Sequence, residues 1–306
     1  MIKKIFASVV LVALIIGGIV FAVHRTAVSS TDAGKLQVVA SYYPMYDFAK
    51  DVGGDKISLT NVTPAGSEPH DYEPSPKVLA EAHKAKVFIY NGGHLEPWVN
   101  GFLSDYKNVA IKASQGIDLQ VVSDETNATN QVTDPHFWLD PVLAAKIVDN
   151  VRDGLIKADP ANASYYTKNA ADYNVKLAAL DTAYKMGLAD CQIRTLITSH
   201  AAFGYLATRY NLDAQAIAGI SPEEEPSAAK LAELTQLVKD RHIQYVFFES
   251  LVSPRLAATI ASETGAKTLV FDPIEGLSDA NQKQGKNYLT IQEQNLANLR
   301  TALACK

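Results

Sequence analysis

Residues 159 to 186 read DPANASYYTKNAADYNVKLAALDTAYKM. Asp159-Pro160 is a typical helix start, because proline is tolerated at the first helical position. No glycine or proline interrupts residues 161–186, and apolar side chains recur there at steps of three or four residues. The pattern predicts one rigid amphipathic helix over residues 159–188, on the order of 40 Å long at 1.5 Å per residue. Its apolar positions are Tyr166, Ala170, Tyr173, Leu177, Leu180 and Tyr184.

Short apolar runs alternate with helical patterns on both sides of this connecting helix, which favours mainly parallel sheets. We expect strands at 36–41, 57–62, 87–90, 109–111, 194–198, 214–217, 245–248 and 268–271. We expect helices at 45–52, 76–85, 96–106, 202–210, 224–241, 254–264 and 288–303. The polar, non-periodic residues 118–133 predict a loop. The predicted fold is therefore α/β, with an N-terminal lobe at 36–158 and a C-terminal lobe at 189–306, each a mainly parallel sheet flanked by helices.

Length and composition fit a globular protein. The chain has 306 residues, of which 47% are hydrophobic and 20% are charged, so a disordered or fibrous class is excluded. The formal net charge is −5. A protein with this charge has no general basic field, and we therefore expect no nucleic-acid partner.

Residues 1–35 are typical of an export segment and a linker. Lys3 and Lys4 precede an apolar run over residues 5–23, and a polar stretch follows. A cleaved signal peptide has an apolar region of about 7–15 residues, whereas a membrane-spanning helix needs roughly 17–25. The run lies near that boundary, so a cleaved signal and a retained membrane anchor both stay open. In either case we predict a periplasmic or cell-surface protein.

The chain contains two cysteines, Cys191 and Cys305. Outside the cytoplasm an even pair favours a disulfide, and two unrelated thiols are the alternative. Nothing like a Cys-x-x-Cys spacing is present, so a cysteine metal site is not expected.

Three histidines stand where a metal ligand would be held rigidly. His136 lies between Asp134-Pro135 and Asp140-Pro141, and His70 has the same kind of proline-rich setting. Proline fixes its own φ and restricts the preceding residue, so both histidines lie on stiff turns. His200 closes the expected strand at 194–198.

Asp272 follows the last expected strand, at 268–271. Parallel α/β sheets place functional loops at the carboxyl ends of strands, so these four residues could converge between the lobes. Three imidazoles and one carboxylate form a tetrahedral set suited to Zn²⁺. Taken singly, each residue has a simpler explanation: a lone histidine is more often a surface or core residue, and an aspartate before proline more often makes a turn.

Other side chains have weaker patterns. His94 could line a cleft, although exposure without ligation is the simpler interpretation. Glu68 or Glu249 could supply an alternative oxygen ligand. Asp71 and Asp140 could orient ligand imidazoles from outside the first coordination sphere, a common arrangement in metal sites.

Two motifs, Pro69–Pro76 and Asp134–Pro141, resemble the ligand-bearing signatures of the metal receptors of bacterial ATP-binding-cassette importers for zinc and manganese. The similarity covers about residues 36 to 304 and continues through 91–92, 95–98, 199–203, 225–227 and 272–273. The resemblance implies two α/β lobes, a connecting helix and a metal buried in the cleft between the lobes. Carried over by position, it makes His70, His136, His200 and Asp272 the metal ligands.

The third position of this ligand set favours zinc. Receptors of this family with glutamate there look manganese-selective, while those with histidine include zinc receptors, and this chain has His200. Imidazole suits Zn²⁺, whereas Mn²⁺ prefers oxygen-rich sites. Many zinc receptors also carry a histidine-rich loop before the second signature, and residues 118–133 contain no histidine. The ligand set therefore predicts Zn²⁺ as the transported ligand, and the lack of histidine in residues 118–133 keeps Mn²⁺ as the alternative.

The predicted function is non-enzymatic: a monomeric receptor that captures Zn²⁺ outside the cytoplasm and delivers it to the membrane permease of an importer. One alternative is a secreted metal-dependent hydrolase that uses His70, His136 and Asp272 with Glu249 as a base. No His-Glu-x-x-His run supports it. Another is an adhesion or structural protein whose lobes a metal holds together.

Overall fold

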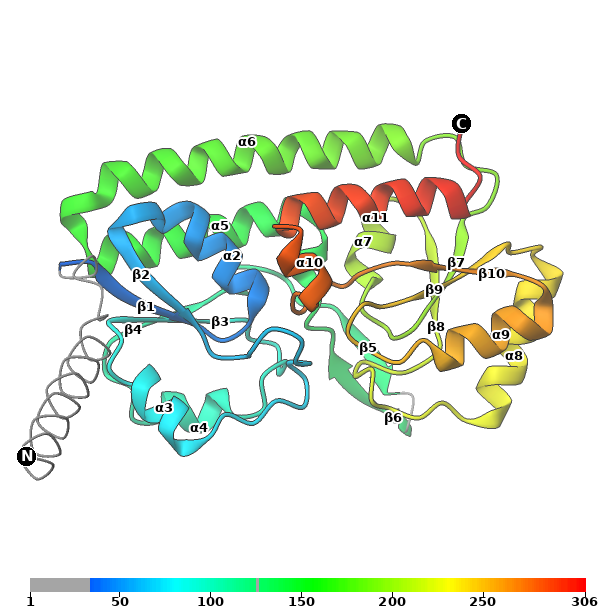
Figure 1. The fold of residues 1–306 in the computed structure, drawn as a ribbon, viewed down its shortest axis with the longest axis horizontal. Helices are drawn as coiled ribbons and strands as arrows, with labels where there is room; N and C mark the ends of the chain where they lie inside the picture. The colour runs from blue at the N-terminus through cyan, green and yellow to red at the C-terminus, as the bar shows by residue number, and fades with distance from the viewer. Residues whose placement is uncertain (1–33, 125–126) are drawn as a thin grey trace, which may run out of the picture. The chain divides into compact units, whose positions relative to one another are not determined.

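Two separate parallel sheets form the framework of residues 36–306 in the computed structural model (Figure 1). The structure describes residues 34–124 and 127–306. The predicted export segment, including the apolar run 5–23, lies outside the described residues. Within them, no helix is both long enough and apolar enough to cross a membrane.

The first sheet has the strand order β2-β1-β3-β4 and the second has the order β10-β9-β7-β8, with every neighbouring pair parallel. The first three residues of β3 are buried, which explains why its run Val87-Phe88-Ile89 is continuously apolar, and all four residues of β7 are buried as well. The strands are β1 Leu36–Ala40, β2 Ile57–Asn61, β3 Val87–Tyr90, β4 Val109–Lys112, β7 Thr195–Thr198, β8 Asp213–Ala216, β9 Tyr245–Phe248 and β10 Lys267–Val270.

Helices cover both faces of each sheet, because parallel strands need crossover connections. Figure 1 shows α2 and α5 on one face of the first sheet and α3 and α4 on the other. The helices are α2 Tyr43–Gly53, α3 Pro76–Ala82, α4 Val99–Leu103, α5 Pro141–Ala158, α6 Ala163–Gly187, α7 Gly204–Arg209, α8 Ala228–Asp240, α9 Arg255–Thr264, α10 Asp279–Lys283 and α11 Tyr288–Ala302. The described residues also include the short 3-10 helices η1 Gly54–Lys56, η2 Phe137–Leu139 and η3 Pro160–Asn162.

The long helix α6 confirms the predicted connecting helix. It covers 25 residues, and its buried side chains are the six apolar positions expected from the sequence. Its first half contacts α2, where Asn169 Nδ2 donates to the carbonyl of Val52 at 3.1 Å. Its second half contacts α11, where the Tyr184 hydroxyl donates to Gln292 Oε1 at 2.7 Å. The same helix therefore packs against α2, which connects two strands of the first sheet, and against α11, which follows β10 of the second sheet. The predicted α/β class is confirmed.

The main hydrophobic core is continuous across these elements. One cluster of buried side chains includes Val38 and Ile89 of the first sheet, Leu177 of α6, and Leu196 and Phe247 of the second sheet. Two smaller clusters lie under α3 and α4 and under α8 and α9. The lobe boundaries at 36–158, 159–188 and 189–306 stay a prediction.

The expectation of a loop at 118–133 is wrong. Two antiparallel strands, β5 Val121–Asp124 and β6 Asn127–Thr133, form a hairpin there. Val121 pairs with Thr133, and Val122 pairs with Val132. These β-branched residues favour strands, but the polar residues between them hide the pattern in the sequence. The hairpin ends directly before the turn that carries His136.

Cys191 and Cys305 form a disulfide, as predicted. Its half-cystines are 114 residues apart in sequence. Cys305 follows α11, and the carbonyl of Asp190 accepts a hydrogen bond from the amide of Lys306 at 2.9 Å. The disulfide and this hydrogen bond therefore hold residues 305–306 beside the segment that follows α6.

Candidate metal-binding site

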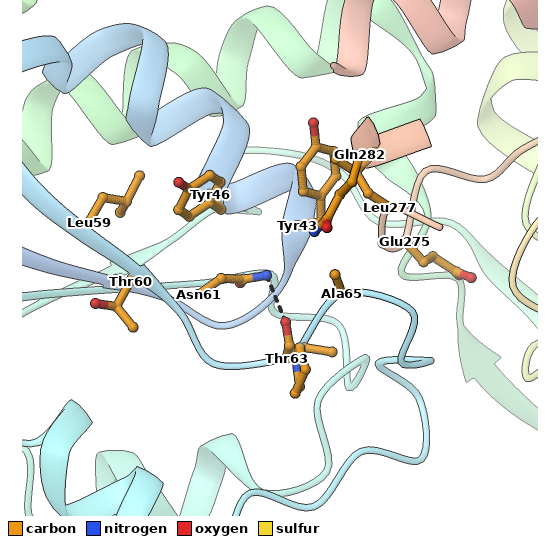
Figure 2. Close-up of a pocket in the computed structure, with 12 residues that line it drawn as sticks. Tyr43, Tyr46, Leu59, Thr60, Asn61, Thr63, Ala65, Glu275, Leu277 and Gln282 are labelled. Carbon is orange, nitrogen blue, oxygen red and sulfur yellow. Dashed lines mark hydrogen bonds between the residues drawn. The ribbon is translucent and has the colours of Figure 1, made fainter. Parts of the chain in front are cut away.

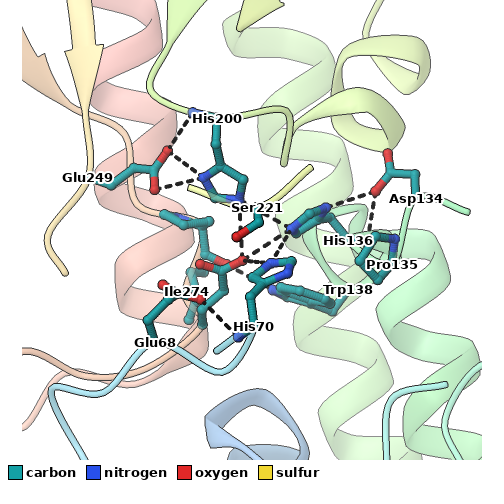
Figure 3. Close-up of polar contacts among 12 residues, drawn as sticks. Glu68, His70, Asp134, Pro135, His136, Trp138, His200, Ser221, Glu249 and Ile274 are labelled. Atoms are coloured by element: carbon teal, nitrogen blue, oxygen red, sulfur yellow. Dashed lines mark hydrogen bonds and ion pairs between the residues drawn. The ribbon is translucent and has the colours of Figure 1, made fainter. Parts of the chain in front are cut away.

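Four side chains from distant parts of the sequence meet at one point. They are His70, His136, His200 and Glu275, and one potential ligand atom from each lies within 4.8 Å of all the others (Figure 3). Each residue follows the carboxyl end of a strand: β2, β6, β7 and β10 respectively. For His70, His200 and Glu275 this is the edge where open parallel sheets place their ligands, whereas His136 follows β6 of the antiparallel hairpin.

The turn that carries His136 is built by its two Asp-Pro sequences. The Asp134 carboxylate accepts the backbone amide of His136 at 2.9 Å. Four residues later, Asp140 is the N-cap of α5 and accepts the amide of Val142 at 2.9 Å, with Pro141 in the first helical position. His136 thus lies between a turn that the Asp134 side chain closes and the start of α5, and its side chain is 0% exposed.

Five of the six separations among the four ligand atoms match the edges of a tetrahedral metal site. His136 Nε2 is 3.2 Å from the Nε2 atoms of both His70 and His200. Glu275 Oε1 is 3.1 Å from Nε2 of His70 and of His136, and 3.4 Å from Nε2 of His200. The edge of a regular tetrahedron is about 1.63 times its centre-to-vertex distance, so such edges fit bonds of roughly 1.9–2.1 Å. Zn²⁺ binds histidine nitrogen at about 2.0–2.1 Å.

Carboxylates outside the group fix two of the imidazoles. Asp134 Oδ1 lies 2.8 Å from Nδ1 of His136, and both oxygens of Glu249 lie 2.8 Å from Nδ1 of His200. An ionised carboxylate can only accept, so each Nδ1 carries a proton, and Nε2 is the nitrogen that each ring offers to a metal. This is the arrangement in which outer carboxylates orient metal-binding histidines.

The outer partners differ from those expected. Asp140 accepts from Arg209 Nε at 2.7 Å and caps α5, and Asp71 is exposed. The expectation that these two orient the imidazoles is therefore wrong; Asp134 and Glu249 hold that position. Asp134 follows β6 and directly precedes Pro135, and Glu249 follows β9. The Asp-Pro pair and the expected strand before Glu249 were both visible in the sequence.

The electrostatics of the group are dominated by burial and by charge pairing. Burial opposes ionisation of Glu275, yet the surrounding imidazoles, His200 foremost, outweigh it and hold the pKa of Glu275 well below its usual range. Burial likewise disfavours a charged His200, but the carboxylates of Glu249 and Glu275 raise its pKa well above the usual value. Without a metal the buried group therefore retains a proton on His200, and a proton on a ligand nitrogen has to leave when a metal binds.

His70 and Glu68 behave differently from the rest. Burial lowers the pKa of His70, which favours the neutral ring that a metal needs. Glu68 Oε1 accepts the backbone amide of His70 at 3.3 Å. Burial, with the nearby charge of Glu275, raises the pKa of Glu68 to about 10, so this carboxyl group is neutral and stands outside the group of four.

The structure does not bring Asp272 into this group. Its Oδ1 accepts the amide of Ile274 at 2.8 Å, and its Oδ2 accepts the hydroxyl of Ser250 at 2.6 Å. Asp272 thus closes a turn, the alternative chemistry of an aspartate before proline. The turn directs Glu275, three residues later, at the histidines. Sequence reasoning did not single out Glu275; its one signal was an acidic residue on the same strand-end loop.

A cavity of about 420 Å³ lies on the other side of this loop. Figure 2 shows that the Glu275 carboxylate points away from Tyr46, Asn61 and Thr63, which line the cavity. The cavity therefore adds no donor atoms to the group. A second cavity, of about 570 Å³, includes His70 and the exposed His94 in its lining.

The sequence and the structure both match known proteins. Residues 38–302 match the family described as zinc-uptake complex component A, periplasmic. The chain is 41% identical to the high-affinity zinc uptake system protein ZnuA of Bacillus subtilis, over 89% of each chain. It is 42% identical to the zinc-binding lipoprotein AdcA of Streptococcus pneumoniae, over 87% of this chain but 56% of AdcA. The matched region therefore spans about half of AdcA.

A solved structure agrees with this relationship. The Zn(II)-bound ZnuA-like domain of Streptococcus pneumoniae AdcA superposes with a TM-score of 0.76 at 41% identity, and the match covers 88% of this chain and 99% of that domain. The family match spans most of the chain, and the relatives exceed the identity at which a shared fold is secure. The chain therefore belongs to the family of zinc-uptake complex component A.

Proposed function

We propose that the protein is a receptor that captures Zn²⁺ outside the cytoplasm, with His70, His136, His200 and Glu275 as ligands, and delivers it to a membrane importer. The observation that carries the proposal is the set of five separations of 3.1–3.4 Å among four ligand atoms, three of them on fully buried residues. Three nitrogens and one oxygen favour Zn²⁺ over Mn²⁺, which prefers oxygen-rich sites.

Binding is better supported than catalysis. Four protein ligands complete a tetrahedral sphere, whereas catalytic zinc usually keeps a position for water. The base that a hydrolase would need, Glu249, is 2.8 Å from His200 Nδ1 and accepts the backbone amide of His200 at 3.1 Å. Glu249 therefore orients the proposed ligand His200, which argues against a role as the base. The names of the relatives, zinc uptake protein and zinc-binding lipoprotein, support the same function.

Zinc titration of the metal-stripped protein tests the proposal. We expect one tight equivalent for the wild type, and loss of tight binding in His136→Ala. A protein that binds no zinc, or an unchanged affinity in His136→Ala, would refute the receptor. Competition with Mn²⁺ at equal free concentration should leave zinc bound.

The fourth ligand is tested by two matched carboxyl-to-amide variants. Glu275→Gln removes the proposed anionic ligand, and we expect affinity to fall by about 100-fold or more. Asp272→Asn keeps an Oδ1 acceptor for the Ile274 amide and should bind zinc nearly as well as the wild type. The reverse result would assign the fourth position to Asp272, as the family resemblance implies.

Delivery needs a separate test in cells. Zinc uptake in a strain that has the importer but lacks its receptor should be restored by the full chain and not by His136→Ala. Restoration by that variant would show that delivery does not depend on this site.

A further inference from the structure

The cavity of about 570 Å³ provides the approach to the histidine group from solvent. His70 is the one member of the group in its lining. The His70 side chain is 7% exposed, whereas those of His136, His200 and Glu275 are 0–1% exposed. A metal ion that travels through this cavity therefore meets His70 first. The lining residues are His70, Gly93, His94, Gln131, Val132, Thr133, Pro135, Ile220, Ser221 and Glu224.

A second imidazole is held on one wall of the cavity. His94 follows two glycines, and Gly92, Gly93 and His94 have φ angles of +80°, +80° and +69°. A non-glycine residue in this left-handed region is uncommon and marks a backbone set by its surroundings. A Cβ on Gly93 would lie 3.6 Å from the Cα of Pro135, so the turn rests against the segment that carries His136. His94 itself is exposed and is not part of the group of four.

A carboxylate is held on the loop at another part of the lining. Glu224 Oε1 accepts the amide of Ser221 at 3.0 Å, and Figure 3 shows Ser221 beside the histidine group. A Cβ on Gly219 would lie 1.9 Å from Glu224 Oε2, so the glycine makes room for this folded-back carboxylate. Neither lysine nor arginine occurs among the described residues that line the cavity. The described lining therefore carries one carboxylate and no lysine or arginine, a charge balance that favours the approach of cations.

We propose that His94 and Glu224, which line the same cavity, each bind Zn²⁺ transiently on the path to the His70–Glu275 group, and we call this pair of contacts the subsite. The inference rests on the proposed function and adds a kinetic step to it. A single imidazole or carboxylate leaves most of the zinc coordination sphere to water, so an ion held there exchanges rapidly. An intermediate site on the path lowers the barrier to entering and to leaving, and it leaves the affinity of the final site unchanged.

Stopped-flow kinetics of the full chain test the subsite. Zinc association would be followed by competition with a fluorescent zinc indicator, and dissociation by transfer to excess chelator. The variants are His94→Asn, which keeps a residue suited to the left-handed backbone, and Glu224→Gln, which keeps the acceptor for the Ser221 amide. Glu225→Gln is the control, because it removes the same charge from a neighbouring exposed residue outside this cavity.

We expect the association and dissociation rate constants to fall together, by about tenfold in the double variant, with Kd unchanged. Glu225→Gln should change association much less. Rates equal to those of the wild type would overturn the subsite. So would an equal fall in Glu225→Gln, which would indicate general attraction, and so would a weaker Kd without slower association, which would make these residues ligands of the final site. Absence of zinc binding in the wild type would instead refute the proposed function.

Discussion

Trp138 Nε1 donates a hydrogen bond to the carbonyl oxygen of Pro273 at 2.8 Å. Trp138 lies two residues after His136, and Pro273 lies two residues before Glu275. The indole is fully buried, and the Trp138 carbonyl accepts the hydroxyl of Tyr288 at 2.6 Å. The hydrogen bond from Trp138 to Pro273 therefore fixes the turn that carries His136 relative to the loop that carries Glu275.

Trp138→Phe should lower zinc affinity by about tenfold, as expected for loss of a partner that orients metal ligands. It should also destabilise the metal-free protein by about 1–3 kcal/mol, because the Pro273 carbonyl loses its donor inside the protein. Isothermal titration and urea unfolding measure the two effects.

Trp98→Phe is the matched control for this variant. Trp98 Nε1 is buried and has no hydrogen-bond partner among the described residues. Its removal should leave zinc affinity unchanged and cost no buried hydrogen bond. An equal loss of affinity in both variants would show that indole volume matters and that the Pro273 bond does not.

Glu249→Gln should weaken zinc binding by about 10- to 100-fold. The amide oxygen can still accept from Nδ1 of His200, but the negative charge that strengthens the imidazole as a donor is lost. The metal-free fold should be little changed, so circular dichroism and unfolding serve as controls. A zinc affinity equal to that of the wild type would show that the negative charge of Glu249 does not influence the site.

Gly204→Ala should reduce zinc affinity through a contact with the partner of His136. A Cβ at Gly204 would lie 2.8 Å from Asp134 Oδ2, so Asp134 must shift. Asp134 Oδ1 contacts the backbone amide and the ring Nδ1 of His136, so this shift would disturb both contacts. Gly101→Ala in α4 is the control, since nothing lies within 4 Å of its added Cβ. That variant should keep full affinity and gain up to about 1 kcal/mol of stability, because alanine favours a helix.

Asp47→Asn should remove one component of the pH dependence of stability. Burial raises the pKa of Asp47 from 3.8 to about 6. Because the folded state holds this proton more tightly than the unfolded chain, the contribution favours folding at low pH and is lost as pH rises through about 4 to 6. Between pH 5 and pH 7.5 the wild type should lose about 1.4 kcal/mol that the variant does not lose.

Urea unfolding of both metal-free proteins at the two pH values measures this difference. An identical pH dependence in the wild type and in Asp47→Asn would contradict the raised pKa. Asp47 accepts from the Tyr43 hydroxyl and from the Tyr288 amide, so the absolute stability of the variant also reports those bonds.

Periodicity was sufficient to predict the framework of the fold. The apolar runs gave the eight strands of the two parallel sheets, and the positions 166, 170, 173, 177, 180 and 184 gave the buried face of α6. The hairpin β5–β6 was missed because its stability depends on pairing across the hairpin, which a single polar stretch does not reveal.

The fourth group of the site could not be predicted from residue type alone. Ile274 has a φ of +60°, which a β-branched residue rarely adopts. That conformation turns the chain after Asp272-Pro273 and brings Glu275 to the histidines. It is held by the Asp272 side chain and by Trp138, which lies 135 residues before Pro273. Such a backbone depends on tertiary contacts, and local sequence preference argues against it.

The four groups span 205 residues of sequence, from His70 to Glu275. An unfolded chain holds them far apart and offers a metal no closed site, so high affinity arises only with the finished fold. Under the proposed function, the compartment in which the chain folds is therefore the compartment whose zinc it samples. A chain that crosses a membrane before folding would carry no cargo outward with it.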